Sequence, residues 1–184
     1  MVGTTDDPVD TLEWHKKIKE DPSISVVVAP SFRPDKALNI RKPGFVDYIH
    51  KLEEVVGRKF ACADCVVGAL DERLQFFVSM GCRASDHGLD YVPFVETDAD
   101  KATAAFKKAM AGEALTQEEG DAYTTYLLIQ LGRLYKKYNV VMQIHYSCLR
   151  NVNEKMYKKL GPDTGYDMIA VTDGSASISS LLSA

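Results

Sequence analysis

The sequence predicts an α/β fold built on parallel strands, and two observations support this. Short apolar runs rich in β-branched residues alternate along the chain with longer segments whose apolar residues recur at helical spacing. Polar residues follow the end of each apolar run, where parallel α/β folds build their functional sites. A doubly wound sheet and a (β/α)8 barrel both have this order of elements, so the order alone does not separate them.

In the first part of the chain the pattern predicts a helix, a strand and a second helix. Asp7 followed by Pro8 is typical of an N-cap and a first helical residue, and this helix is expected to end near residue 20. The run Ser25–Ala29 is apolar, β-branched and bounded by turn residues, which is typical of a buried parallel strand. Helical spacing of apolar residues then predicts a helix over residues 45–56.

The rest of the chain predicts two more strands and four more helices. Cys82–Ser85 is a brief strand candidate followed by a turn at Asp86–Gly88, and Val140–Ile144 is a second apolar run. Thr116 and Glu119 form a capping-box pattern that opens a long helix ending near residue 138. Further helices are expected over residues 64–80, 99–111 and 153–160.

Composition and charge exclude two classes of partner. The 184 residues carry a formal net charge of −4, whereas a nucleic-acid surface needs clustered lysine and arginine. No apolar run approaches the length needed to cross a bilayer. The N-terminal residues have neither the basic nor the apolar region of a signal peptide, so we expect a cytoplasmic protein.

Cys62 and Cys65 form a C-x-x-C motif. A structural zinc site would need a second pair of cysteine or histidine ligands, and the sequence has none at similar spacing. A redox pair should follow a strand and open a helix, but the segment before Cys62 has the pattern of a helix end and a turn. We therefore interpret the pair as cytosolic thiols near a helix start.

Five side chains that follow the predicted strands are candidate site residues: Arg33, Asp86, His87, His145 and Arg150. Arginine offers a planar fork for a carboxylate, while histidine and aspartate transfer protons or bind metals. Four of them have a plainer interpretation, namely a surface ion pair for Arg33, an Asx turn for Asp86 and His87, and a structural role for His145. No Gly-x-Gly-x-x-Gly or Gly-x-x-x-x-Gly-Lys motif follows a strand, which excludes the usual dinucleotide and P-loop sites.

The amino-acid sequences of several segments resemble those of the uronate isomerase (glucuronate isomerase) family. The segments occur in the family's order and are spread over nearly the whole chain. The segments are Thr4-Thr5-Asp6-Asp7-Pro8, Leu12-Glu13-Trp14-His15, Pro30-Ser-Phe-Arg33-Pro34-Asp35-Lys36, Gly44-Phe-Val-Asp-Tyr48, Gly81-Cys-Arg-Ala-Ser-Asp86-His87-Gly88, Met142-Gln-Ile-His145, Leu149-Arg150-Asn151 and Gly161-Pro-Asp-Thr-Gly165. Together these motifs are highly specific.

The resemblance implies a fold, a reaction and a cofactor. The fold is a distorted (β/α)8 TIM-type barrel of the amidohydrolase superfamily, of which this chain would cover roughly strands two to five. The reaction interconverts D-glucuronate with D-fructuronate and D-galacturonate with D-tagaturonate, by moving a proton between C2 and C1 through an enediol. The cofactor is a divalent metal, usually zinc, and the full-length protein is expected to be a homo-oligomer.

The resemblance also implies roles for the candidate residues. Arg33 would bind the carboxylate of the sugar acid, with Arg150 as a second substrate-binding residue. His145 would be catalytic, facing the substrate's carbonyl end and the metal, for which it is a candidate ligand. Asp86 and His87 would line the same mouth as catalytic residues.

The sequence departs from the family at the metal site. The resemblance implies that the metal is held, as in this superfamily, by a His-x-His pair on the first strand and an aspartate on the eighth, and this sequence contains no His-x-His. Such a barrel needs about 250 residues, so we expect residues 1–184 to form a single partial barrel domain that is inactive alone, as an internal fragment. The serine-rich residues 170–184 are expected to be a disordered or non-native tail.

Two further functions remain open on the sequence. One is a non-catalytic or partner-complemented module that binds sugar acids. The other is a metal-dependent hydrolase of the same superfamily, which would act through a metal-activated water.

Overall fold

A computed structural model describes residues 1–184, and four of its strands form two parallel pairs that lie side by side. β1 (Val2–Asp6) pairs in parallel with β2 (Val28–Phe32), and β3 (His87–Leu89) pairs in parallel with β4 (Ile144–Tyr146). Isolated parallel bridges join the segment before β3 to β2 on one side and to the segment before β4 on the other. The prediction of an α/β fold with adjacent parallel strands is therefore confirmed.

The strand at the centre of this arrangement is longer than the sequence predicted. Backbone hydrogen bonds run from Phe32 N to Ala84 O (3.1 Å) and from Asp86 N to Phe32 O (3.0 Å). On the other side, His87 N donates to Gln143 O at 3.0 Å. Because these bonds keep the chain extended through residue 89, the predicted turn at Asp86–Gly88 is wrong.

The first strands also differ from the prediction. The strand expected at Ser25–Ala29 begins three residues later, and Val26 and Val27 are 48% and 62% exposed. Its position follows from pairing with β1, a strand whose polar sequence did not reveal it. Asp7 and Pro8 do not open a helix either, because the Asp7 carboxylate accepts the Val9 N–H in a turn.

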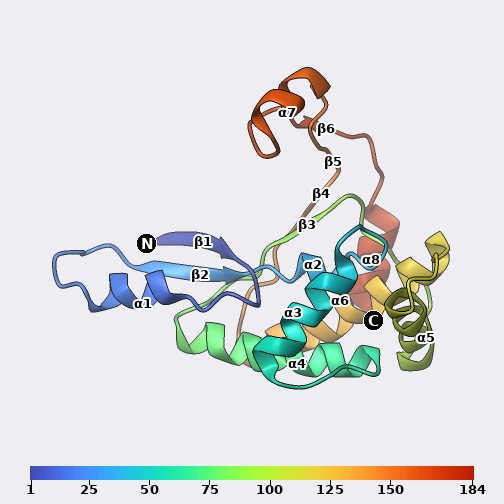
Figure 1. Cartoon of the computed structure of the whole chain (residues 1–184), viewed down its shortest axis with the longest axis horizontal. Helices are drawn as coiled ribbons and strands as arrows, with labels where there is room; N and C mark the ends of the chain where they lie inside the picture. The colour runs from blue at the N-terminus through green and yellow to red at the C-terminus, as the bar shows by residue number, and fades with distance from the viewer.

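The helices agree more closely with the sequence. Those in the body are α1 (Glu13–Glu20), α2 (Asp35–Leu38), α3 (Phe45–Val56), α4 (Ala63–Ser79), α5 (Ala99–Met110) and α6 (Gln117–Tyr138). The capping box predicted at Thr116 is present, and Asn139 ends α6 in the left-handed conformation. Figure 1 shows α3, α4 and α6 gathered beside the strands.

The core lies between the strands and these helices. Phe32 of β2 is fully buried, and its ring meets that of Phe77 from α4 edge-on at 5.1 Å between centroids. Tyr135 of α6 contacts the same ring in a similar geometry. Aromatic residues from three elements thus fix β2, and with it the residues that follow the strand.

The last part of the chain projects from the body and then returns to it (Figure 1). β5 (Cys148–Leu149) and β6 (Met168–Ile169) pair antiparallel, with α7 (Glu154–Leu160) between them. We call residues 148–169 the arm. α8 (Ser175–Ser183) follows the arm, and its Ile178 and Leu181 pack against the core. None of the helices combines the length and the apolar character needed to cross a membrane.

Candidate functional site

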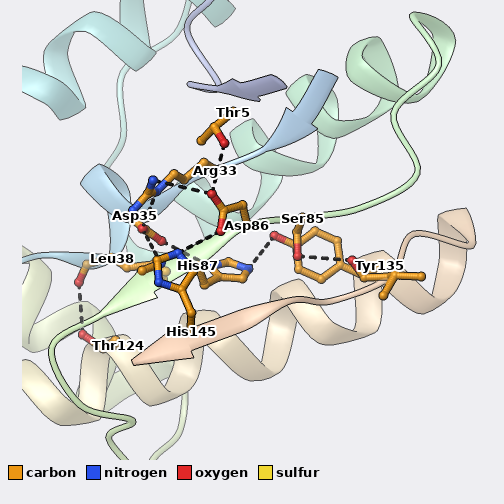
Figure 2. Close-up of polar contacts among 12 residues, drawn as sticks. Thr5, Arg33, Asp35, Leu38, Ser85, Asp86, His87, Thr124, Tyr135 and His145 are labelled. Carbon is orange, nitrogen blue, oxygen red and sulfur yellow. Dashed lines mark hydrogen bonds and ion pairs between the residues drawn. The ribbon is translucent and has the colours of Figure 1, made fainter. Parts of the chain in front are cut away.

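Three of the predicted site residues meet where neighbouring strands end (Figure 2). Asp86 lies between the other two, with Oδ1 3.0 Å from His145 Nε2 and Oδ2 3.5 Å from Arg33 Nη1. Arg33 follows β2, Asp86 precedes β3 and His145 lies within β4. The hydroxyl of Thr5, from β1, donates to the same Asp86 carboxylate at 3.2 Å. Four successive strands thus supply this cluster, which we call the rim cluster: Thr5, Arg33, Asp86 and His145.

Asp35 supports the rim cluster from below. Its Oδ2 atom accepts hydrogen bonds from Arg33 Nε at 2.9 Å and from the Gly88 backbone N–H at 2.8 Å. Burial alone would raise the pKa of the Asp35 carboxyl, but contacts with His87, Gly88 and Arg33 together hold it below its ordinary value. Asp35 is therefore a fixed negative charge that orients the Arg33 guanidinium.

Gly88 gives the Arg33 and His145 side chains the room to approach each other. A Cβ atom at this position would lie 2.3 Å from Arg33 Nη2 and 2.8 Å from His145 Cε1. Any side chain here would force one of these groups to move, so the backbone of β3 forms the floor of the rim cluster.

His87 points away from the mouth, into the protein. Its ring is fully buried, with Nε2 3.0 Å from the Tyr135 hydroxyl. Nδ1 lies 3.3 Å from Asp35 Oδ1, and neither of these two atoms makes a well-directed hydrogen bond. The cause is strand geometry, because successive residues of an extended chain face opposite sides and Asp86 takes the outer one. The expectation that His87 lines the mouth is therefore not met.

Thr5 and Arg33 of the rim cluster, together with Gly88, line an open hollow of about 470 Å³, whereas Asp86 and His145 lie outside its lining. Its walls carry cations and carboxylates from the body and the arm: Asp6, Asp7, Arg33, Asp35, Lys36, Lys42, Asp90, Arg150 and Asp163. Arg150 lies at the arm's side, where Nη1 is 2.6 Å from Asp167 Oδ2. That hydrogen bond raises the pKa of Arg150, which stays a cation facing the hollow without contacting Arg33.

Sequence reasoning missed two of these contributors. Thr5 escaped notice because β1 was not predicted, although it lies in the same stretch as Asp6 and Asp7. Gly88 was assigned to a turn, and only its close approach to two side chains reveals its role.

The chain does not by itself form a metal site. It contains no group of three or more histidine, cysteine, aspartate or glutamate side chains placed to hold a metal ion. His145 and Asp86 are adjacent, but a catalytic zinc normally takes about three protein ligands. The residues present therefore do not fit the divalent metal that the sequence resemblance implied.

Comparison with known proteins was consistent across sequence and structure. The family model for glucuronate isomerase matches residues 1–184. A uronate isomerase of Caldanaerobacter subterraneus subsp. tengcongensis is 49% identical over 182 residues, which are 99% of this chain and 39% of that protein. The crystal structure of uronate isomerase from Thermotoga maritima superposes with a TM-score of 0.91 at 36% identity, over 98% of this chain and 40% of that one.

A more distant structure has the same fold. Glucuronate isomerase from Caulobacter crescentus superposes with a TM-score of 0.86 at 24% identity, over 98% of this chain and 37% of that one. The chain thus spans about two fifths of the length of the relatives it matches.

Proposed function

Since the chain belongs to the glucuronate isomerase family, we propose that it supplies part of the active site of an aldose–ketose isomerase of sugar acids. The reaction would convert D-glucuronate to D-fructuronate and D-galacturonate to D-tagaturonate. The observation that carries this proposal is the rim cluster, in which an arginine and an Asp–His pair share one edge of the parallel strands.

The strands fit the proposal as part of a (β/α)8 barrel, roughly its strands two to five. β1 to β4 follow one another in chain order and are parallel. The outer edge of β1 and the outer edge of β4 have no strand partner in this chain. Val2 and Val141, on these two outer strand segments, are 51% and 67% exposed. Further strands would cover both edges.

Arg33 is the proposed binding residue for the substrate carboxylate. Its guanidinium has five N–H donors, and the contacts with Asp35 and Asp86 leave several of them without a partner. The two aspartates fix the plane of the fork, so it is oriented before the substrate arrives. Arg150, on the other wall of the hollow, would add a second positive charge.

His145 and Asp86 are the proposed proton-transfer pair. His145 is partly exposed, and the contact with Asp86 occupies its Nε2, so Nδ1 would be the nitrogen that takes the substrate's proton. A base in this position would remove the C2 proton of the aldose, giving an enediol, and return a proton to C1 to form the ketose. Buried His87 would act as a positioning residue, through Asp35 and Arg33.

The reaction also needs the carbonyl and hydroxyl oxygens to be polarised, which a divalent metal supplies in the family's chemistry. This chain lacks a set of ligands for it, so the proposed proton transfer uses His145 and Asp86 alone. Any remaining ligands would come from outside this sequence.

A chimera tests the proposal directly. The matched segment of the Caldanaerobacter uronate isomerase is replaced by this chain, and ketose formation from D-glucuronate is measured. We expect activity in the chimera and its loss in His145→Gln, with unchanged circular dichroism in both. A folded His145→Gln chimera that keeps full activity would refute the role of His145, and a folded chimera without activity would refute the proposed function.

A further inference from the structure

Cys62 and Cys65 lie together at the start of α4, on a part of the chain that the rim cluster does not use. Cys62 is the N-cap of this helix, and its sulfur accepts the backbone N–H of Cys65 at 3.2 Å. The sulfur of the first cysteine therefore lies over the backbone of the second. Both side chains are partly exposed, whereas Cys82 is fully buried.

The expectation of a helix start at this pair is confirmed, and it changes how the motif is interpreted. A C-x-x-C that opens a helix places both sulfurs near the positive end of the helix dipole, which favours a thiolate. α4 is long enough, over Ala63–Ser79, for this effect to be substantial. A redox motif has a strand before it and a helix after it. Here the helix that favours a thiolate is present, although no strand precedes the motif.

The two thiols also interact with each other. The hydrogen bond that they share lowers the pKa of Cys65 and raises that of Cys62. Asp64, between them, is turned toward the Tyr126 hydroxyl, which donates a hydrogen bond to its carboxylate. The backbone N–H of Cys65 that donates to Cys62 Sγ also favours a thiolate at Cys62, so either thiol can react first.

We propose that Cys62 and Cys65 form a reversible dithiol–disulfide site that reacts with small disulfides of the glutathione class. The thiolate of one cysteine attacks one sulfur of the small disulfide, forms a mixed disulfide and releases one small thiolate. The sulfur of the other cysteine, after losing its proton to solvent, attacks the protein sulfur of the mixed disulfide and displaces the second thiolate. Both protein thiols are oxidised to one disulfide, and the small disulfide is reduced to two thiols.

The geometry suits this step better than it suits a metal. Cys62 is the N-cap and Cys65 the third helical residue, and the 3.2 Å contact of Cys65 N with Cys62 Sγ brings the pair together, as a disulfide with a Cα separation of about 4.4–6.8 Å requires. A structural zinc would need two more ligands, and the chain offers no group of three.

Mass spectrometry of the whole chain tests the proposal. The reduced protein is incubated with oxidised glutathione, quenched in acid, alkylated and digested with trypsin. The peptide Phe60–Arg73 contains both cysteines of the pair and no other, while Cys82 and Cys148 fall in separate peptides. We expect this peptide to lose two hydrogens and to lose both alkylation sites, and dithiothreitol to restore them.

Two variants serve as controls. Cys62→Ser should stop at the mixed disulfide, so glutathione stays attached to Cys65. Cys148→Ser should oxidise like the unchanged chain, since Cys148 lies on the arm. The proposal is overturned if the unchanged chain keeps both thiols of the pair reduced while Cys148 becomes glutathionylated. It is equally overturned if mixed disulfides accumulate at the pair without closing, or if closure occurs only in urea.

Discussion

His145 Nε2 lies 3.0 Å from Asp86 Oδ1, although the two residues come from different strands. The contact exists because β3 and β4 run side by side in parallel, with Gly88 opposite His145 in the register. Since Asp86 also faces Arg33, one carboxylate joins the proposed proton-transfer residue to the proposed substrate-binding residue.

Replacing Gly88 by alanine should disturb this arrangement. The new Cβ would lie within 2.3 Å of Arg33 Nη2 and 2.8 Å of His145 Cε1, so both side chains must shift. We expect a loss of unfolding free energy of about 1–3 kcal/mol, the range for overpacking, measured by urea denaturation. Gly68→Ala is the matched control, because its Cβ would meet nothing closer than 3.9 Å inside α4. That control should gain roughly 0.5–1 kcal/mol, and equal effects of the two changes would contradict the prediction.

Arg33→Ala should weaken the binding of D-glucuronate. The change removes the proposed carboxylate partner and leaves the Asp35 and Asp86 carboxylates to repel the anionic substrate. We expect a loss of about 1.5–3 kcal/mol, typical for a hydrogen bond to a charged group, measured by calorimetry on the chimera. Arg58→Ala is the control, since Arg58 forms an exposed ion pair with Glu72. Unchanged affinity in Arg33→Ala would remove this residue from the substrate site.

Glu53 should make the stability of the chain depend on pH in the acid range. Burial alone would raise its pKa, but hydrogen bonds from Lys59, His50 and the Phe60 N–H lower it from 4.5 to about 2. Because the folded value lies below the unfolded one, the stabilisation is present above pH 4.5 and is lost as the pH falls toward 2. Glu53→Gln should therefore cost about 1–3 kcal/mol at pH 6 and progressively less below pH 4.5.

Urea denaturation at a series of pH values measures the effect of Glu53→Gln. The control is Glu72→Gln, whose exposed pair with Arg58 should contribute less than about 1 kcal/mol. A cost for Glu53→Gln that stays constant from pH 6 to pH 2 would show that the carboxylate is not responsible.

Most of the helices could be predicted from the sequence, because their signals are local, but α2, α8 and the strand β1 were not predicted. The capping box at Thr116 and the left-handed Asn139 bound α6 as expected. The strands were harder, since their limits depend on pairing with distant residues. β2 ends at Phe32 because it pairs with β1 and packs on Phe77, whereas the more apolar Val26 and Val27 stay outside it.

Site residues could be predicted from the sequence only where the end of a strand could be located. Arg33, Asp86 and His145 follow or end apolar runs, and the structure brings them together. His87 could not be separated from Asp86 by sequence, because which of two neighbours faces the core depends on the strand continuing through them. Thr5 could have been predicted as a site residue only if β1 had been predicted, and the polar sequence of β1 does not indicate a strand.

The purified chain, supplied with zinc or manganese, should not convert D-glucuronate above background. Isomerisation needs polarised oxygens as well as proton transfer, and this chain has no group of three ligands to hold a metal. His145 and Asp86 alone would place an ion poorly, and a misplacement of about 1 Å can cost roughly 100-fold in rate. The measurement is ketose formation by the chain alone, with the chimera as the positive control. Turnover of about 1 per second or faster by the chain alone would contradict this prediction and would mean that its own residues complete the site.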